Sequence, residues 1–246
     1  MKPLPAVILA AGRGRRLGRL SDNQPKPMTE VNGVSIFDNL LGSLIAQGLE
    51  RIILVTGYLD QILVNAANPY RDRCEIITVY NEIYATTNNI YSLWLASQYL
   101  TEGFYLFEAD IFFENAVMES LVNADHDDVM LIGKYNAHMD GTVVDLDARD
   151  RVLSMYLKQH QGDGFDYSDK YKTVNFYRIG KEFAAGFFLE KMKEHIVQGD
   201  LNSYYELIIK EALDRGHPIY GLKTGPHRWW EIDTLDDLTY CESLFG

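Results

Sequence analysis

Positive charge is scarce in this chain. Its 246 residues include 23 Lys and Arg against 35 Asp and Glu, which gives a formal net charge of −12. This surplus of negative charge disfavours binding to nucleic acid or to an anionic membrane surface, so we expect neither as a partner. An anionic substrate would therefore need a local basic site, helped by a divalent metal ion.

Cysteine, clustered histidine and long apolar runs are also lacking. The two cysteines, Cys74 and Cys241, lie far apart, which predicts a reduced, cytoplasmic setting without disulfides. The six histidines show no spacing typical of a zinc site. No apolar run approaches the roughly 18 residues of a membrane-spanning helix, and the N-terminus does not resemble a secretion signal. We expect a cytoplasmic protein that is not inserted in a membrane.

The first 30 residues contain the strongest chemical signal. The apolar segment 6–10 runs into a turn that contains Gly12 and Gly14, and Lys26 follows between two prolines. Glycines let backbone N–H groups approach phosphate oxygens and form an anion-binding nest. Arg16 and Lys26 add positive charge suited to phosphate. This pattern predicts a binding site for a nucleoside triphosphate.

Other interpretations of this turn fit less well. The dinucleotide-binding fingerprint needs a third glycine at the right spacing and an acidic residue about twenty positions on, and both are missing. A Walker A loop would need Gly-Lys-Ser/Thr, which does not follow. The arginines at 13–16 could contact nucleic acid, but they stand at a strand-to-loop junction of an acidic chain. A plain glycine turn with surface arginines is the simplest alternative for Gly-x-Gly taken alone.

Short apolar segments alternate with helical patterns over the first 135 residues. Near-continuous apolar strands between helices predict a parallel sheet that is covered on both faces. Ligands of such sheets bind beyond the carboxyl ends of the strands, where the Gly12 turn and Asp110 would fall. The expected strands are 6–10, 52–56, 76–80, 104–109 and 129–133, and the expected helices are 37–47, 58–66, 90–100 and 115–123.

The pattern changes after residue 135. Two antiparallel strands are expected around a polar turn, followed by a polar segment that is a loop or lid. The expected elements are strands 142–146 and 152–157, the loop 159–172, strand 174–179, helices 181–198 and 203–215, strand 218–222 and helix 235–244. We expect residues 1–246 to form one domain of the Rossmann-like α/β class, with a mostly parallel mixed sheet. Its nucleotide-binding core would be 1–135, and 136–246 would form a smaller α+β acceptor-binding region with a closing helix.

Two carboxylates follow short strands. Asp110 ends the strand 104–109, and Asp233 follows another short apolar segment. A carboxylate beside a phosphate-binding turn suits Mg²⁺, which prefers hard oxygen ligands and bridges substrate phosphates. Each residue also fits a helix N-cap, Asp110 for the segment after it and Asp233 for the helix that starts near Leu235.

Several motifs resemble a known enzyme family. Residues 9–18 with 25–27 resemble the signature of the nucleotidyltransferases that join nucleoside triphosphates to sugar 1-phosphates and phospho-alcohols. Residues 88–93, Asn-Asn-Ile-Tyr-Ser-Leu, resemble a segment of bacterial phosphocholine cytidylyltransferases. Residues 172–177 and 230–234 are similar to segments in the cytidylyltransferases of phosphonate biosynthesis. The resemblance implies a Mg²⁺-dependent transfer of CMP from CTP to a small phosphonate or phospho-alcohol, such as 2-aminoethylphosphonate or 2-hydroxyethylphosphonate, with release of pyrophosphate.

The resemblance also implies roles for individual residues. Arg16 would contact the β- and γ-phosphates, Lys26 the α-phosphate, and Lys172 the phosphate or phosphonate of the acceptor. Arg13 and Arg15 depart from the family pattern and would lie in solvent or at a subunit surface. The implied nucleotide-binding residues are Leu9, Ala10, Ala11, Gly12, Gly14, Asn88, Ser92 and Asp110, the implied acceptor-binding residues are Lys172, Asn175, Trp230 and Glu231, and the implied metal ligands are Asp110 and Asp233.

The residues leave the acceptor open. Trp229 and Trp230 could form a cation–π wall for choline. An amine would call for a carboxylate, with Glu231, Asp145 and Glu206 as candidates, and a hydroxyl or carboxyl group would call for Arg178 or Lys134. The alternative functions are a phosphocholine cytidylyltransferase, a sugar-1-phosphate nucleotidyltransferase and a non-catalytic nucleotide-binding regulatory protein. A homodimer is possible.

Overall fold

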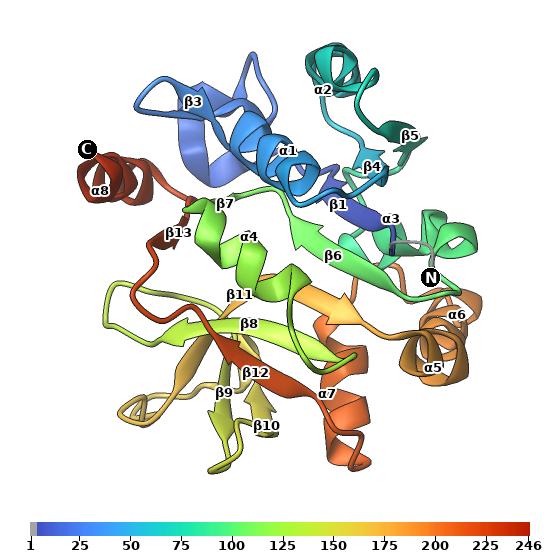
Figure 1. Cartoon of the computed structure of the whole chain (residues 1–246), viewed down its shortest axis with the longest axis vertical. Coiled ribbons are helices and arrows are strands. Elements are labelled where there is room, and N and C mark those ends of the chain that lie inside the picture. The colour runs from blue at the N-terminus through green and yellow to red at the C-terminus, as the bar shows by residue number, and fades with distance from the viewer. Residues whose placement is uncertain (1–3) are drawn as a thin grey trace.

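The computed structural model describes residues 4–246 and contains a nine-stranded mixed sheet (Figure 1). Its main strand order is β10-β9-β11-β6-β1-β4-β5, and β8 pairs with β11 and β12. The strands β6, β1, β4 and β5 are mutually parallel, whereas β11 runs antiparallel to its neighbours. The bounds are β1 Ala6–Ala10, β4 Arg51–Thr56, β5 Glu75–Tyr80, β6 Phe104–Glu108, β8 Val129–Lys134, β9 Val143–Leu146, β10 Val152–Tyr156, β11 Tyr171–Ile179 and β12 Tyr220–Lys223.

Helices cover both faces of this sheet, because successive side chains of a strand point to opposite faces. In β1, Ile8 packs in one core cluster and Val7 in the other. The first face is covered by α1 (Ile36–Ala46), α2 (Asp60–Ala67) and α4 (Asn115–Val122), and α1 and α4 lie in front of the sheet in Figure 1. The second face is covered by α3 (Asn89–Leu95), α6 (Leu189–Val197) and α7 (Glu206–Asp214). The arrangement confirms the predicted Rossmann-like α/β class.

The strands β7 (Ile111–Phe113), β2 (Glu30–Val31) and β3 (Val34–Ser35) were not predicted, and β7 positions the site. β7 (Ile111–Phe113) pairs antiparallel with β13 (Trp229–Glu231), and Ile111 lies opposite Glu231. This pairing brings the chain that precedes the last helix, α8 (Leu235–Phe245), to the carboxyl end of β6. The other two strands form a hairpin of β2 (Glu30–Val31) and β3 (Val34–Ser35). Strands of two or three residues are too short to show a periodic pattern in the sequence.

Several predicted boundaries differ from those observed. The helix predicted over 90–100 ends at Leu95, after which the chain tightens into a 3₁₀ turn. The helix predicted over 181–198 is divided by a π-helical turn into α5 (Lys181–Phe183) and α6. The predicted loop 159–172 is shorter, because β11 begins at Tyr171. The remaining short helices are Arg15–Ser21, Lys26–Met28, Asn68–Tyr70, Ser97–Tyr99, Lys158–His160 and, of the π type, Ala184–Phe188.

No helix within residues 4–246 combines the length and the apolar character that crossing a membrane requires.

Candidate active site

A cavity of about 740 Å³ opens where β1 ends. The turn after β1 forms one wall, and the start of α3 and the end of β6 form others. At Gly14, φ is 68°, and a Cβ there would lie 2.8 Å from Cβ of Lys26, so glycine lets the turn pack closely on that lysine. All the predicted nucleotide-binding residues line this cavity, namely Leu9, Ala10, Ala11, Gly12, Gly14, Asn88, Ser92 and Asp110.

Lys26 lies at the centre of an ion-pair network in this cavity. Its Nζ is 2.8 Å from Oδ2 of Asp110 and 2.6 Å from Oδ1 of Asp233. Arg16 Nη2 lies 2.8 Å from the same oxygen of Asp233. Burial opposes the charge on Lys26, but the attraction of the two carboxylates outweighs it and raises the pKa of its ammonium above the ordinary value. Four predicted site residues are therefore brought together from distant parts of the chain.

Neither aspartate serves as a helix cap. Asp110 is followed by β7, and the N-cap of α8 is Thr234, which forms a capping box with Asp237. Only the backbone N–H of Asp233 contacts that box, where it donates to Asp237. Oδ1 of Asp110 is buried and has no hydrogen-bond partner within residues 4–246. An unpartnered carboxylate oxygen beside a second carboxylate fits the oxygen ligands that Mg²⁺ prefers.

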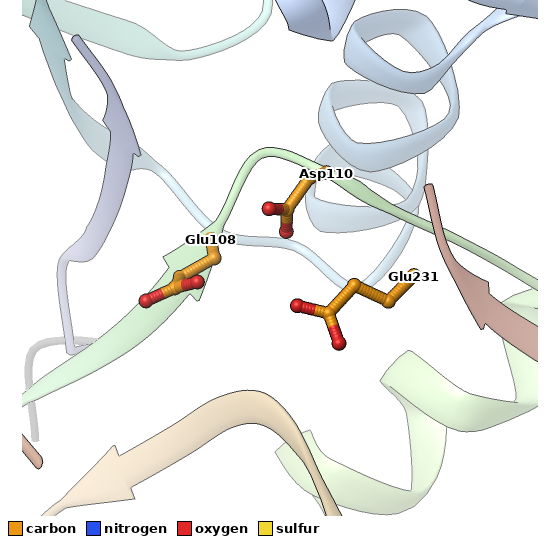
Figure 2. A group of neighbouring side chains, drawn as sticks. All are labelled: Glu108, Asp110 and Glu231. Atoms are coloured by element: carbon orange, nitrogen blue, oxygen red, sulfur yellow. The ribbon is translucent and has the colours of Figure 1, made fainter. Parts of the chain in front are cut away.

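A third and a fourth carboxylate lie beside Asp110. Oxygens of Glu108, Asp110 and Glu231 all lie within 4.8 Å of one another, in the hollow between β6 and β13 (Figure 2). Burial, and then repulsion by Asp110, Glu206 and Glu231, raises the pKa of the Glu108 carboxyl well above its ordinary value. Sequence reasoning missed Glu108, although a charged residue near the end of the apolar strand 104–109 was a signal for it.

Neutral groups hold Glu108 in place. Its Oε1 accepts hydrogen bonds from Tyr205 Oη at 2.9 Å and Asn89 Nδ2 at 3.1 Å. Its Oε2 accepts one from Asn175 Nδ2 at 3.4 Å. Asn175 lies where the pairing of β11 with β8 is irregular, and its φ of 61° is left-handed. Asparagine tolerates this conformation better than most residues, and the irregularity directs its side chain toward Glu108.

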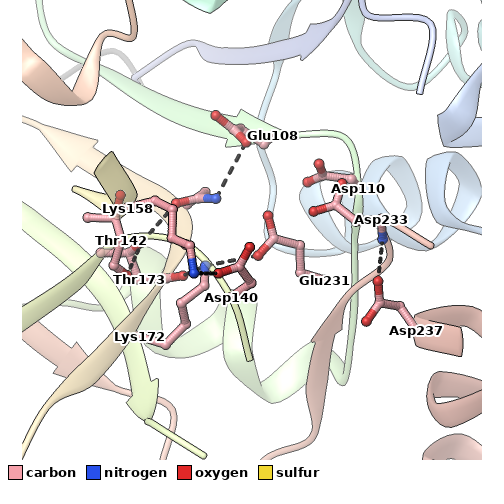
Figure 3. Close-up of polar contacts among 12 residues, drawn as sticks. Glu108, Asp110, Asp140, Thr142, Lys158, Lys172, Thr173, Glu231, Asp233 and Asp237 are labelled. Atoms are coloured by element: carbon pink, nitrogen blue, oxygen red, sulfur yellow. Dashed lines mark hydrogen bonds and ion pairs between the residues drawn. The ribbon is translucent and has the colours of Figure 1, made fainter. Parts of the chain in front are cut away.

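A second cavity, of about 190 Å³, adjoins the first. Arg16 and Asp233 line both. The second cavity is also lined by Lys172, Trp230 and Glu231, three of the four predicted acceptor-binding residues. Lys172 is only 2% exposed, and its Nζ lies 2.9 Å from Oε2 of Glu231 (Figure 3). The fourth residue, Asn175, reaches the site through Glu108.

The aromatic pair of the second cavity is mostly buried. A Cβ on Gly133 would lie 2.5 Å from the indole of Trp229, so the two residues are in close contact. Trp230 packs on Tyr240, with a distance of 4.4 Å between ring centroids. Trp229 and Trp230 are 6% and 4% exposed, respectively. Both line the second cavity, but most of each ring fills the core.

Other candidates for contact with the acceptor lie elsewhere. Asp145 pairs with Lys170 at 2.8 Å, Arg178 donates to the carbonyl oxygen of Ala124, and Lys134 donates to that of Ser168. None of the three candidates lines either cavity among the described residues. Glu206 lies behind Asn89, whose Nδ2 donates to it at 3.3 Å.

The three arginines of the glycine turn all line the larger cavity. Arg13 pairs with Asp22 at 3.1 Å and lies over the ring of Tyr58. Arg15 is exposed. Arg16 is the arginine of this turn that pairs with a predicted metal ligand, Asp233.

Comparisons with known proteins give one family and several relatives. A family model described as the MobA-like NTP transferase domain matches residues 6–220. The chain is 34% identical to the CMP-5'-(3-aminopropyl)phosphonate synthase of Streptomyces rubellomurinus over 99% of its own length, but spans only 39% of that protein. It is 30% identical to the 2-aminoethylphosphonate cytidylyltransferase of Lancefieldella rimae, over 60% of this chain and 58% of that protein. The solved structure of CTP:phosphocholine cytidylyltransferase from Streptococcus pneumoniae has the same fold, with a TM-score of 0.84, 21% identity and coverage of 99% and 100%.

Proposed function

This chain belongs to the family of MobA-like NTP transferase domains, and on that premise we propose that it transfers CMP from CTP to a small phosphonate or phospho-alcohol, releasing pyrophosphate. The membership confirms the resemblance drawn from the Gly12 turn and Lys26. The observation that carries the proposal is the position of the Lys26 ammonium, within hydrogen-bond distance of both Asp110 and Asp233 beside the larger cavity. Support for CTP comes from the relatives named for cytidylyl products and from the segment 88–93.

The reaction requires little covalent chemistry from the protein. An oxygen of the acceptor's phosphonate or phosphate is already anionic near pH 7, so no strong general base is needed. This oxygen forms a bond to the α-phosphorus of CTP, the bond from that phosphorus to the bridging β-oxygen breaks, and pyrophosphate leaves with the electron pair. The protein has to hold two anions together and offset their repulsion.

The turn after β1, the start of α3 and the basic side chains of the larger cavity are assigned to the nucleotide. The backbone of the Gly12 turn would hold the phosphates, and Asn88 and Ser92 would lie beside the base and ribose. Lys26 would offset the charge that develops at the α-phosphate, and Arg16 would contact the β- and γ-phosphates. Magnesium, when bound by Asp110 and Asp233, would polarise the phosphoryl oxygens as a Lewis acid.

The second cavity is assigned to the acceptor. It meets the first at Arg16 and Asp233, which would bring the acceptor's anionic end to the nucleotide's phosphates. Lys172, which forms an ion pair with Glu231, is the cationic residue assigned to that anionic end. Trp230 would complete the wall.

Pyrophosphate release tests this function. Four nucleoside triphosphates with Mg²⁺ are each paired with phosphocholine, 2-aminoethylphosphonate, 2-hydroxyethylphosphonate and glucose 1-phosphate. The proposal predicts turnover restricted to CTP with one or more of the first three acceptors. It also predicts that Asp110→Asn removes this turnover, whereas the matched surface change Asp214→Asn does not.

Other results of the same assay would contradict the proposal. Turnover with glucose 1-phosphate would make the chain a sugar-1-phosphate nucleotidyltransferase. CTP binding without turnover of any acceptor would favour the non-catalytic alternative. Failure to bind any nucleotide would mean that the Gly12 turn has another purpose.

A further inference from the structure

Glu108 is a half-buried carboxylate that forms no ion pair within residues 4–246. Its three hydrogen-bond donors, Tyr205, Asn89 and Asn175, are all neutral. Within residues 4–246 no Lys, Arg or His forms an ion pair with it, in contrast to Asp110 and Glu231. A carboxylate that is largely shielded from water and has no cation beside it is costly to the folded protein. Glu108 lines the larger cavity, and Glu231, with an oxygen within 4.8 Å of an oxygen of Glu108, lines the second cavity, so an acceptor bound in the second cavity can bring a positive charge to Glu108.

The hollow next to Glu108 has the form of a small cation site. Oxygens of Glu108, Asp110 and Glu231 lie within 4.8 Å of one another (Figure 2). Oxygens that each accept a hydrogen bond of about 2.8 Å from one tetrahedral nitrogen lie roughly 4.6 Å apart. This spacing suits an ammonium group that donates to more than one carboxylate.

The surrounding charges also favour a cation. Arg16, Lys26 and Lys172 lie among five carboxylates, which are Glu108, Asp110, Glu206, Glu231 and Asp233. Magnesium at Asp110 and Asp233 would leave Glu108 and Glu206 without a cation of their own. CTP and the acceptor's phosphonate bring further negative charge into the same space.

From this geometry we propose that Glu108 determines acceptor specificity by accepting hydrogen bonds from a primary ammonium group on the acceptor. The inference rests on the proposed function, because it concerns the acceptor of that reaction. A quaternary ammonium has no N–H to donate, and its methyl groups keep the nitrogen away from carboxylate oxygens. A neutral hydroxyl would leave the charge of Glu108 unmatched. The chain therefore selects aminoalkyl phosphonates or phosphates over their hydroxyl and trimethylammonium counterparts.

Asn175 supports this selection as a positioning residue. It donates to Oε2 of Glu108, and its own Oδ1 accepts a hydrogen bond from Thr173 Oγ1 at 2.9 Å. Glycine at position 175 keeps access to the left-handed conformation and removes only the amide. Asn175→Gly therefore loosens Glu108 without imposing backbone strain.

The inference is tested by comparing acceptors that differ only in the group at carbon 2. Values of kcat/KM are measured with CTP and three phosphonates of equal chain length, carrying a 2-amino, a 2-hydroxy or a 2-trimethylammonio group. For the wild type, the 2-amino acceptor is expected to be favoured by about 100-fold. Glu108→Gln is expected to lower kcat/KM for the 2-amino acceptor by about 100-fold, mainly through KM, and to change that for the 2-hydroxy acceptor less than about threefold. Asn175→Gly is expected to act in the same direction with about a tenfold loss.

Controls separate this inference from the function on which it rests. Glu75→Gln changes an exposed glutamate of β5 and should leave all three values unchanged. Binding of CTP, measured by calorimetry, should be the same for the wild type and Glu108→Gln. Equal losses for the 2-amino and 2-hydroxy acceptors would overturn the ammonium inference and assign Glu108 to a metal or to the fold. Absence of turnover with every acceptor in the wild type would overturn the proposed function, and this inference with it.

Discussion

At the scale of single residues, Lys26 and the proposed Mg²⁺ ion compete for the same two carboxylates. The ammonium of Lys26 lies between Asp110 and Asp233, which we assign to Mg²⁺, and its contacts are as short as 2.6 Å. A divalent cation that enters without nucleotide must displace this ammonium from both carboxylates. Phosphate groups of CTP offer Lys26 another partner, so nucleotide and metal should bind together more favourably than either alone.

Lys26→Met tests this competition. Removing the ammonium should strengthen the binding of Mn²⁺, used as a probe, to the nucleotide-free protein, measured by electron paramagnetic resonance. The same change should lower turnover on the order of 10²–10³-fold, because the charge at the α-phosphate is no longer offset. Lys181→Met, at an exposed position, is the control. Weaker Mn²⁺ binding to Lys26→Met would show that Lys26 organises the carboxylates and does not compete for them.

At the scale of elements, hydrogen bonds between side chains fix neighbouring helices to one another. The first turn of α1 holds Asp38, whose backbone N–H donates to the N-cap Ser35 at 2.9 Å. Tyr70, in the short helix Asn68–Tyr70, donates its hydroxyl to Oδ1 of Asp38 at 2.8 Å. This bond ties α1 to the segment that follows α2 on the same face of the sheet.

The effect of Tyr70→Phe on the free energy of unfolding should depend on pH. Burial and the bond to Asp38 raise the pKa of Tyr70 from 10.0 to about 12. The folded chain therefore retains this proton more tightly than the unfolded chain, so the contribution to stability is complete below pH 10 and is lost as the pH rises toward 12. Tyr70→Phe should lower the free energy of unfolding by about 1 kcal/mol at pH 8 and by less at alkaline pH.

Urea unfolding at the two pH values measures this difference. Tyr80→Phe, at an exposed position of β5, should change the free energy of unfolding little at either pH. A Tyr70→Phe difference that stayed constant with pH would mean that the hydroxyl does not titrate with a raised pKa.

The strands and their pairing also show which parts of the fold and site could be predicted from the sequence. The long apolar strands and the strand-end position of Asp110 were predicted, because they depend on local pattern and on the direction of parallel strands. The pairing of β7 with β13, which brings Asp233 and Glu231 to Asp110, joins segments more than a hundred residues apart. The left-handed Asn175 and the donors around Glu108 also arise from such distant contacts. No local pattern in one sequence encodes them.

At the scale of the whole molecule, a chain of net charge −12 places Lys26 in the larger cavity, Lys172 in the smaller and Arg16 in both. The larger cavity carries the predicted nucleotide residues, and the smaller carries most of the predicted acceptor residues. Asp233, which belongs to the predicted acceptor-binding region 136–246, lines both cavities.

Thermal unfolding should report joint binding by the whole chain. CTP with Mg²⁺ at about 100 times the dissociation constant should stabilise the fold by roughly 2.7 kcal/mol. For a chain of this size that corresponds to a rise in Tm of roughly 5–10 °C. Either component alone should give a smaller rise, and a chelator should reverse the effect of the pair. An equal rise with Mg²⁺ alone would contradict the competition assigned to Lys26.

The identity of the product tests the central claim most directly. The protein is incubated with CTP, Mg²⁺ and 2-aminoethylphosphonate, and the mixture is followed by ³¹P nuclear magnetic resonance. The account predicts a new pair of coupled signals, from a phosphonate joined to CMP through an anhydride, with an equal amount of pyrophosphate. Free CMP with an unchanged phosphonate signal, or CTP left intact while it is bound, would contradict it.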